Sequence, residues 1–147
     1  MSVSPSRLLV DAIVMRDWDG LGRCLSPDVW LRALLPRGIV EHHTAGDALD
    51  TIVGWFTGAS AFVPTWVEHV ETGGARARVG WEVELLPEWA PETWHRVEQV
   101  GFCRVADGHV RRLDLSCTGF IALGGRLHET FRPSPSVTAP DGGRCRP

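Results

Sequence analysis

The chain has 147 residues, of which 44 % are hydrophobic and 22 % charged, and its formal net charge is −3. This length and composition fit one globular domain with a sizeable core, and they leave no comfortable room for two. A slightly acidic chain lacks the basic surface that nucleic-acid binding requires, so we expect no nucleic-acid partner.

The amino-terminal segment has the features of neither a membrane anchor nor an export signal. No run of about 18 apolar residues occurs in the chain, and Asp11 interrupts the first apolar stretch. We therefore expect a cytoplasmic protein without a membrane partner. Reduced thiols are expected rather than disulfides or a zinc site, because no CxxC pair occurs among Cys24, Cys103, Cys117 and Cys145.

Three helices are predicted in the first part of the chain. Apolar residues at helical spacing predict a helix from Ser6, its N-cap, to about Arg16. The segment WDGLGRCLS predicts a short second helix capped by Asp17. After it, VWLRALLP predicts a strand, and GIVEHH its hairpin partner or a loop. The segment TAGDALDTIVGWFTGA predicts a third helix, with Thr44 as its N-cap and Gly58 near its end.

Strands follow, because the apolar period changes from 3.6 to 2 after the third helix. The alternation predicts strands from Phe62 to Glu71, Ala75 to Leu86 and Thr93 to Val105, and the Asp-Gly turn of ADGH leads into HVRRLDLSCTGF. Such long strands favour an α+β fold, in which a strongly curved antiparallel sheet wraps the three helices as a cone with one open end. We expect one domain over residues 1–131 and a disordered tail over 132–147, which is rich in Pro, Gly and Ser.

Three segments together carry a family resemblance: RDWDGLGRCLSPDVWLRALLP, GDALDTIVGWF and WHRVEQVGFCRVADGHVRRLDLSCTGF. They resemble the SnoaL-like polyketide cyclase group of the nuclear transport factor 2-like superfamily, over about residues 6 to 121. The resemblance implies a cone-shaped fold with a hydrophobic cavity. It also implies a cyclase or isomerase that acts on a polyketide-type natural product by acid and base catalysis without a cofactor. The same fold hosts non-catalytic ligand-binding and dimerisation modules, so that alternative stays open.

Asp114 is the position that best matches the catalytic aspartate of the SnoaL-like cyclases. Alternation places it with Arg112 and Ser116 on one side of its strand, opposite an apolar side that contains Leu115 and Cys117. Asp114 is the acid and base if the polar side faces the cavity, or if a bulge reverses the register. It points to solvent or to a dimer partner if the apolar side faces the cavity.

A second reaction class is open at the same strand. Arg112 and Asp114 have the two-residue spacing of the limonene epoxide hydrolase branch, where a second carboxylate faces the pair. In this chain Glu98 or Glu82 would be the second carboxylate. An epoxide hydrolase or an epoxide-opening ether cyclase is therefore the alternative enzyme.

Other candidate site residues lie on the neighbouring strand and among the aromatic side chains. His95, Gln99 and Cys103 share one side of the strand 93–105, where His95 and Gln99 could hold a developing oxyanion. They could equally be a strand-end histidine and a satisfied core amide. Aromatic residues either pack the core or contact a flat apolar ligand, and the candidates are Trp18, Trp55, Phe56, Phe62, Trp66 and Trp81.

Two further expectations concern metals and partners. His42 and His43 are adjacent and form no HxH or HExxH motif, so we expect no metal site, although one of them could act as a base at the mouth of the cone. Apolar groups on both faces of the strands 75–86 and 93–105 predict a homodimer. The helices can cover only one face, so Val100 and Phe102 need another partner.

Overall fold

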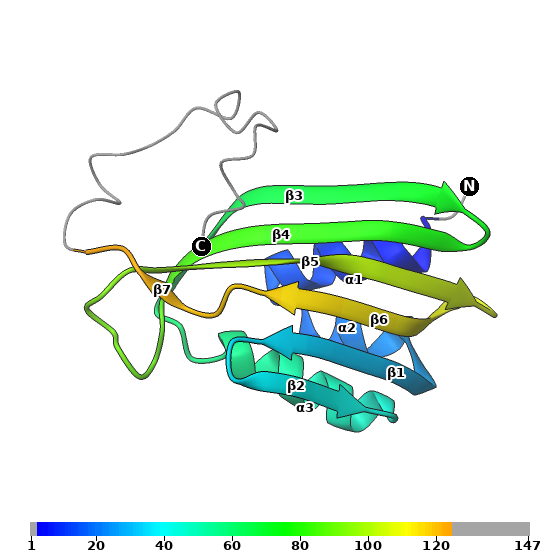
Figure 1. Cartoon of the computed structure of the whole chain (residues 1–147), viewed down its shortest axis with the longest axis horizontal. Helices are drawn as coiled ribbons and strands as arrows, with labels where there is room; N and C mark the ends of the chain where they lie inside the picture. Colours follow the sequence, from blue (N-terminus) through cyan, green and yellow to red (C-terminus); the bar gives the residue numbers. More distant parts are fainter. Residues whose placement is uncertain (1–2, 125–147) are drawn as a thin grey trace.

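The computed structural model describes residues 3–124, so the expected tail and the end of the expected domain lie outside the described residues. The structure has three helices within the first 56 residues and long strands after them, as the apolar spacing of the sequence predicts (Figure 1). Their bounds are α1 (Pro5–Met15), α2 (Trp18–Cys24), β1 (Leu25–Leu35), β2 (Gly38–His42), α3 (Ala45–Phe56), β3 (Ala61–Gly73), β4 (Arg76–Leu86), β5 (His95–Ala106), β6 (His109–Cys117) and β7 (Ile121–Ala122).

The strands form one sheet in the order β2-β1-β6-β5-β4-β3, with β7 paired to the start of β5. Four pairs of successive strands are antiparallel, as expected of strands joined directly by turns or loops: β1 with β2, β3 with β4, β4 with β5, and β5 with β6. β1 and β6 instead pair in parallel, which makes the sheet mixed. No hairpin turn joins these two strands, so the turn geometry does not dictate their direction.

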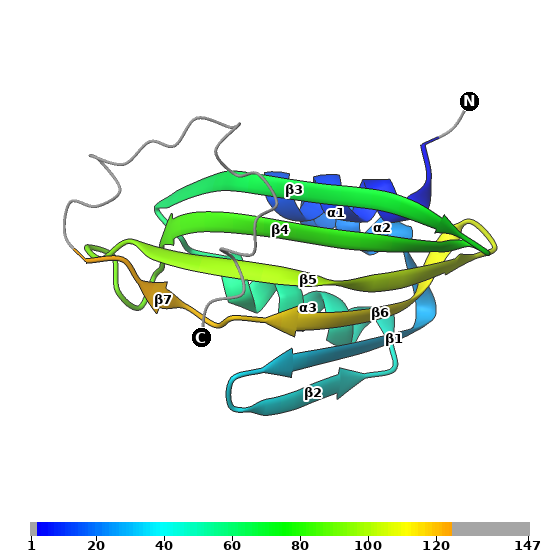
Figure 2. The same ribbon diagram turned by 45° about the horizontal axis from the view of Figure 1, so that its top comes forward.

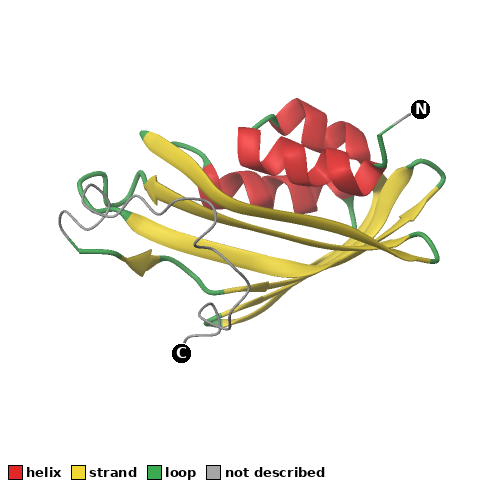
Figure 3. Cartoon of the chain, turned by 90° about the horizontal axis from the view of Figure 1, so that it is seen from above, coloured by secondary structure: helices red, strands yellow, loops and turns green. Residues whose placement is uncertain are grey.

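All three helices cover the same face of the curved sheet (Figure 3). α1 packs against β3 and β4, and α3 packs against β1 (Figure 2). We call the covered face the inner face and the opposite one the outer face. This is the α+β architecture expected from the sequence, with the core between the helices and the inner face.

The start of α1 differs from the sequence prediction. Ser4, not Ser6, is the N-cap, because its side chain accepts a hydrogen bond from the backbone N–H of Arg7 and Pro5 occupies the first helical position. Ser6 is buried, and its hydroxyl lies 2.8 Å from Nε2 of His69 on β3. The sequence pattern is the same for both serines, and only the position of Pro5 distinguishes them.

Candidate functional site

A pocket of about 550 Å³ opens on the inner face, where the helical layer ends. Its floor is the inner face of β5, at Val97 and Gln99. Its walls come from four other segments: residues 35–37 at the β1–β2 turn, Trp55 and Phe56 at the end of α3, Trp89 in the β4–β5 loop, and residues 117–120 after β6.

Gln99 is the polar residue of the pocket floor, and its amide has a defined orientation. Nε1 of Trp81 on β4 donates a 2.7 Å hydrogen bond to Oε1 of Gln99. An indole N–H can only donate, so the amide oxygen faces Trp81 and the NH₂ group faces the other way. That NH₂ group donates to Sγ of Cys117 over 3.3 Å and keeps one further hydrogen for the pocket.

Cys117 contributes a protonated thiol to the pocket wall. Burial raises the pKa of Cys117 more than the hydrogen bonds from the Gly119 backbone and Gln99 lower it. A protonated thiol presents an S–H donor rather than a nucleophilic thiolate. Gln99 and Cys117 therefore form a pair of hydrogen-bond donors at the base of the pocket.

His95 lies directly behind the aromatic wall. It is buried, and its ring centroid is 4.8 Å from that of Trp89 and 6.4 Å from that of Phe120. Its Nδ1 lies 2.8 Å from the carbonyl oxygen of Thr93. A carbonyl oxygen only accepts, so Nδ1 carries the proton and Nε2 is the basic nitrogen.

Asp114 lies outside this pocket. The apolar side of β6 faces the helices, with Leu113 and Leu115 buried, so Asp114 is on the outer face. There its carboxylate accepts a 2.7 Å hydrogen bond from Nε of Arg112, with 38 % of the side chain exposed. Period-2 alternation thus turns the carboxylate of Asp114 away from this pocket, and its expected role as acid and base stays a prediction.

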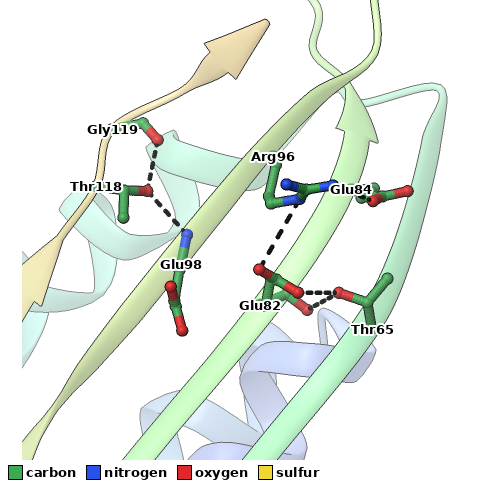
Figure 4. A network of polar contacts seen from close by, with 7 residues as sticks. All are labelled: Thr65, Glu82, Glu84, Arg96, Glu98, Thr118 and Gly119. Carbon is green, nitrogen blue, oxygen red and sulfur yellow. Dashed lines mark hydrogen bonds and ion pairs between the residues drawn. The ribbon is translucent and has the colours of Figure 1, made fainter. Parts of the chain in front are cut away.

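The carboxylates of the epoxide hydrolase alternative are also on the outer face, at its other end (Figure 4). Thr65 Oγ1 donates to Glu82 over 2.9 Å, and Arg96 forms a 3.8 Å ion pair with the same carboxylate. In the strand register Glu98 of β5 lies opposite Glu82 of β4, whereas Phe102 of β5 lies opposite Asp114 of β6. Four residues along β5 separate the two positions by about 13 Å, so neither glutamate meets Asp114.

The remaining candidates are divided between the pocket and other parts of the molecule. Trp55 and Phe56 line the pocket, and Trp81 is fully buried behind its floor. Cys103 is buried further along β5, where Ser6 of α1 contacts its thiol. The other aromatic candidates do not line this pocket: Trp18 packs against the core, Phe62 packs edge-on against Phe56, and Trp66 covers Gly80 on the outer face.

The two adjacent histidines are engaged away from the pocket. Nε2 of His42 lies 2.7 Å from Oγ1 of Thr51, and His43 lies 3.5 Å from Glu41. Within residues 3–124, no three His, Cys, Asp or Glu side chains are grouped so that they could hold a metal ion.

Sequence reasoning missed several pocket residues, among them Arg37, Trp89, Cys117 and Phe120. Trp89 lies in PEWAPE, a segment whose composition predicts only a turn, and Phe120 is the last residue of the predicted strand HVRRLDLSCTGF. A tryptophan between two prolines in a predicted loop is a sequence signal that could have identified this wall, and in the structure its side chain is 64 % exposed.

Solved structures resemble this fold over most of the chain. An LEH-like epoxide hydrolase from Mycobacterium tuberculosis matches with a TM-score of 0.60 and 13 % identity, over 77 % of this chain and 79 % of that one. A candidate ketosteroid isomerase from Kribbella flavida matches with a TM-score of 0.56 and 22 % identity, over 88 % of this chain and 87 % of that one. The chain has the nuclear transport factor 2-like fold.

Another protein with the nuclear transport factor 2-like fold is a candidate polyketide cyclase from Sinorhizobium meliloti. It matches with a TM-score of 0.53 and 22 % identity, over 76 % of this chain and 92 % of that one. These neighbours agree with the SnoaL-like resemblance of the sequence, and at such identities they establish the fold alone. No protein-family model and no curated protein matches the sequence. Among the described residues, no helix is both long and apolar enough to span a membrane.

Proposed function

We propose that this protein is a cofactor-free cyclase or isomerase of SnoaL-like type, acting on a hydrophobic polyketide-type compound in the inner-face pocket. The observation that carries the proposal is the buried amide of Gln99, which Trp81 orients so that its N–H group serves the pocket. A buried donor held in one orientation is what a developing oxyanion needs, because no reorganisation is required during the reaction.

The elementary step common to aldol cyclisation and double-bond isomerisation is removal of a proton from the carbon next to a carbonyl group. In this proposal the N–H of Gln99 and the S–H of Cys117 stabilise the enolate oxygen. Nε2 of His95, which lies behind Trp89 and Phe120 and outside the pocket lining, accepts the proton through a water molecule. In a cyclisation the enolate carbon then attacks a second carbonyl group. In an isomerisation the conjugated enolate instead takes up the proton at a more distant carbon. His95 returns the proton in either case, so the enzyme ends in its starting state.

Exchange of α-protons for deuterium tests this step without knowledge of the natural substrate. We expect the protein to accelerate the exchange of 2-tetralone in D₂O, followed by proton NMR. Gln99→Leu and His95→Gln should each lower the rate by roughly 100-fold. Asp114→Asn is the matched control and should leave the rate unchanged. Equal rates with and without protein, or full activity of both the Gln99 and the His95 variant, would contradict the proposal.

A non-catalytic ligand-binding module is the second candidate. It is favoured by the absence of any carboxylate among the described residues that line the pocket. Binding of 2-tetralone without exchange would support it. Hydrolysis of styrene oxide that depends on Asp114 or Glu82 would instead support the epoxide hydrolase or ether cyclase alternative.

We also propose that a second copy of the chain covers the outer face. Leu34, Ile39, Val100 and Phe102 are exposed there, and Phe102 alone is 53 % exposed. Sedimentation velocity at micromolar concentration should report a dimer that Phe102→Ser converts to a monomer. Met15→Ser, which removes an exposed apolar group from the end of α1, should leave the dimer intact. A monomeric wild-type protein would refute the proposed dimer.

The cytoplasmic location stays a prediction, for which cell fractionation is the measurement.

A further inference from the structure

The polar side chains that line the pocket offer hydrogen-bond donors and a positive charge to a ligand. Gln99 and Cys117 offer donors at the base, and Arg37 adds a positive charge at the rim. Thr118 uses its hydroxyl elsewhere, since Oγ1 accepts from the Glu98 backbone and donates to the carbonyl of Gly119. No carboxylate lines the pocket among the described residues. A ligand that fits this lining therefore carries acceptors at two separate points.

Arg37 is positioned at the rim by the β1–β2 turn. Pro36, the preceding residue, packs against Gly119, where a Cβ would lie 2.7 Å from Cγ of Pro36. Gly119 has a φ of +78°, so it admits this close approach without the strain that another residue would suffer. The turn is thus seated directly on the 117–120 wall of the pocket.

The guanidinium of Arg37 forms no ion pair with any carboxylate of residues 3–124. Four of the seven arginines on the described strands do, among them Arg78 with Glu68, Arg96 with Glu84, and Arg112 with Asp114. Arg37 differs from the other unpaired ones in that it lines this pocket. A guanidinium can bind a carboxylate through two parallel hydrogen bonds. Arg37 is therefore free to bind an anionic group of a pocket ligand.

The aromatic walls define the shape of what lies between the two polar ends. Trp55 lines one side, and Trp89 and Phe120, whose ring centroids are 5.4 Å apart and nearly perpendicular, line the other. Such rings contact a flat apolar body with little loss of conformational entropy.

From these three features we infer that the ligand is a flat apolar carboxylic acid, with its carboxylate at Arg37 and a carbonyl oxygen at Gln99. The inference rests on the proposed function, because it names the substrate class of the same pocket. It goes further by assigning Arg37 as the residue that selects an anionic over a neutral compound.

The test compares two probes of nearly the same size and shape, of which 2-naphthoate is anionic and 2-naphthamide is neutral. Their Kd values are measured by isothermal titration calorimetry at low salt. We expect the wild type to bind the naphthoate roughly 5- to 20-fold more tightly, as a charge-assisted hydrogen bond implies. Arg37→Gln should abolish that preference and leave the Kd of the naphthamide unchanged. Arg23→Gln, an exposed arginine of α2 outside the pocket, is the matched control and should keep the preference.

Two results would overturn the inference, and they differ in what else they affect. Equal Kd values for both probes in the wild type, or equal weakening of both by Arg37→Gln, would refute the anionic ligand. Deuterium exchange of 2-tetralone could still be intact, and the proposed function would then stand. If neither probe bound and no exchange occurred, the pocket itself would be refuted, and the role of Arg37 with it.

Discussion

The indole Nε1 of Trp81 donates a 2.7 Å hydrogen bond to Oε1 of Gln99, its direct partner across the β4–β5 ladder. Both residues are almost completely buried. The bond satisfies two polar groups that burial would otherwise penalise, and it fixes which end of the amide serves the pocket. Structure and proposed chemistry thus depend on the same pair.

Trp81→Phe is expected to cost about 1–3 kcal/mol of unfolding free energy, because Oε1 of Gln99 is left buried without its donor. Urea unfolding is the measurement. The double variant Trp81→Phe with Gln99→Met should lose clearly less than the sum of the two single losses, since both unpaired groups are then gone. Strict additivity would mean that the two side chains do not interact in solution.

Gly101→Ala should prevent stable folding or cost more than about 3 kcal/mol, which is the scale of severe core overpacking. A Cβ at Gly101 would lie 1.8 Å from the carbonyl oxygen of Asp114, inside the β5–β6 ladder. Gly54→Ala is the control. It lies in α3 with open space around its Cβ position, so it should gain about 0.5–1 kcal/mol from helix propensity. Thermal unfolding of both variants compares them, and a stable Gly101→Ala would contradict the register of β5 with β6.

Stability is expected to fall above pH 9. Burial raises the pKa of Cys24 from 9.0 to about 12 and that of Cys103 from 9.0 to about 11. Both thiols then hold their protons more tightly in the folded chain, so their contribution is complete below pH 9 and is lost as pH rises toward 11 and 12. Between pH 8 and 10 the loss is roughly 1.4 kcal/mol for each thiol.

Urea unfolding under reducing conditions at pH 8 and pH 10 measures this loss. The variant Cys24→Ala with Cys103→Ala should be less stable at pH 8, and its stability should depend much less on pH. The same alkaline loss in this variant would assign the effect to other groups.

Asp114→Asn should change the unfolding free energy by no more than about 1 kcal/mol, because its ion pair with Arg112 is partly exposed and screened by water. Naphthoate binding and deuterium exchange should be unaffected, since the carboxylate lies on the outer face. Chemical unfolding and the two pocket assays measure these effects. A large loss of exchange with normal binding would restore Asp114 as the acid and base.

The sequence by itself determined the elements and their faces. Apolar periods predict the three helices and the long strands, and the structure confirms Thr44 as the cap of α3. Period-2 alternation also separates Gln99 from Phe102, and Asp114 from Leu115, because successive side chains of a strand point to opposite faces. Alternation alone therefore assigns Gln99 and His95 to the same side of β5.

Only the tertiary structure decided which side of β6 meets the pocket and which residues close its walls. A period of 2 divides the side chains of a strand into two sets, but it does not say which set faces the pocket. That is decided by the face of the sheet on which the helices pack. Arg37, Trp89 and Phe120 lie in loops, where no period marks a side chain as inward, so their convergence depends on the path of the chain. The orientation of the Gln99 amide likewise needed Trp81 as its cross-strand partner, and that register is set by the pairing of β4 with β5.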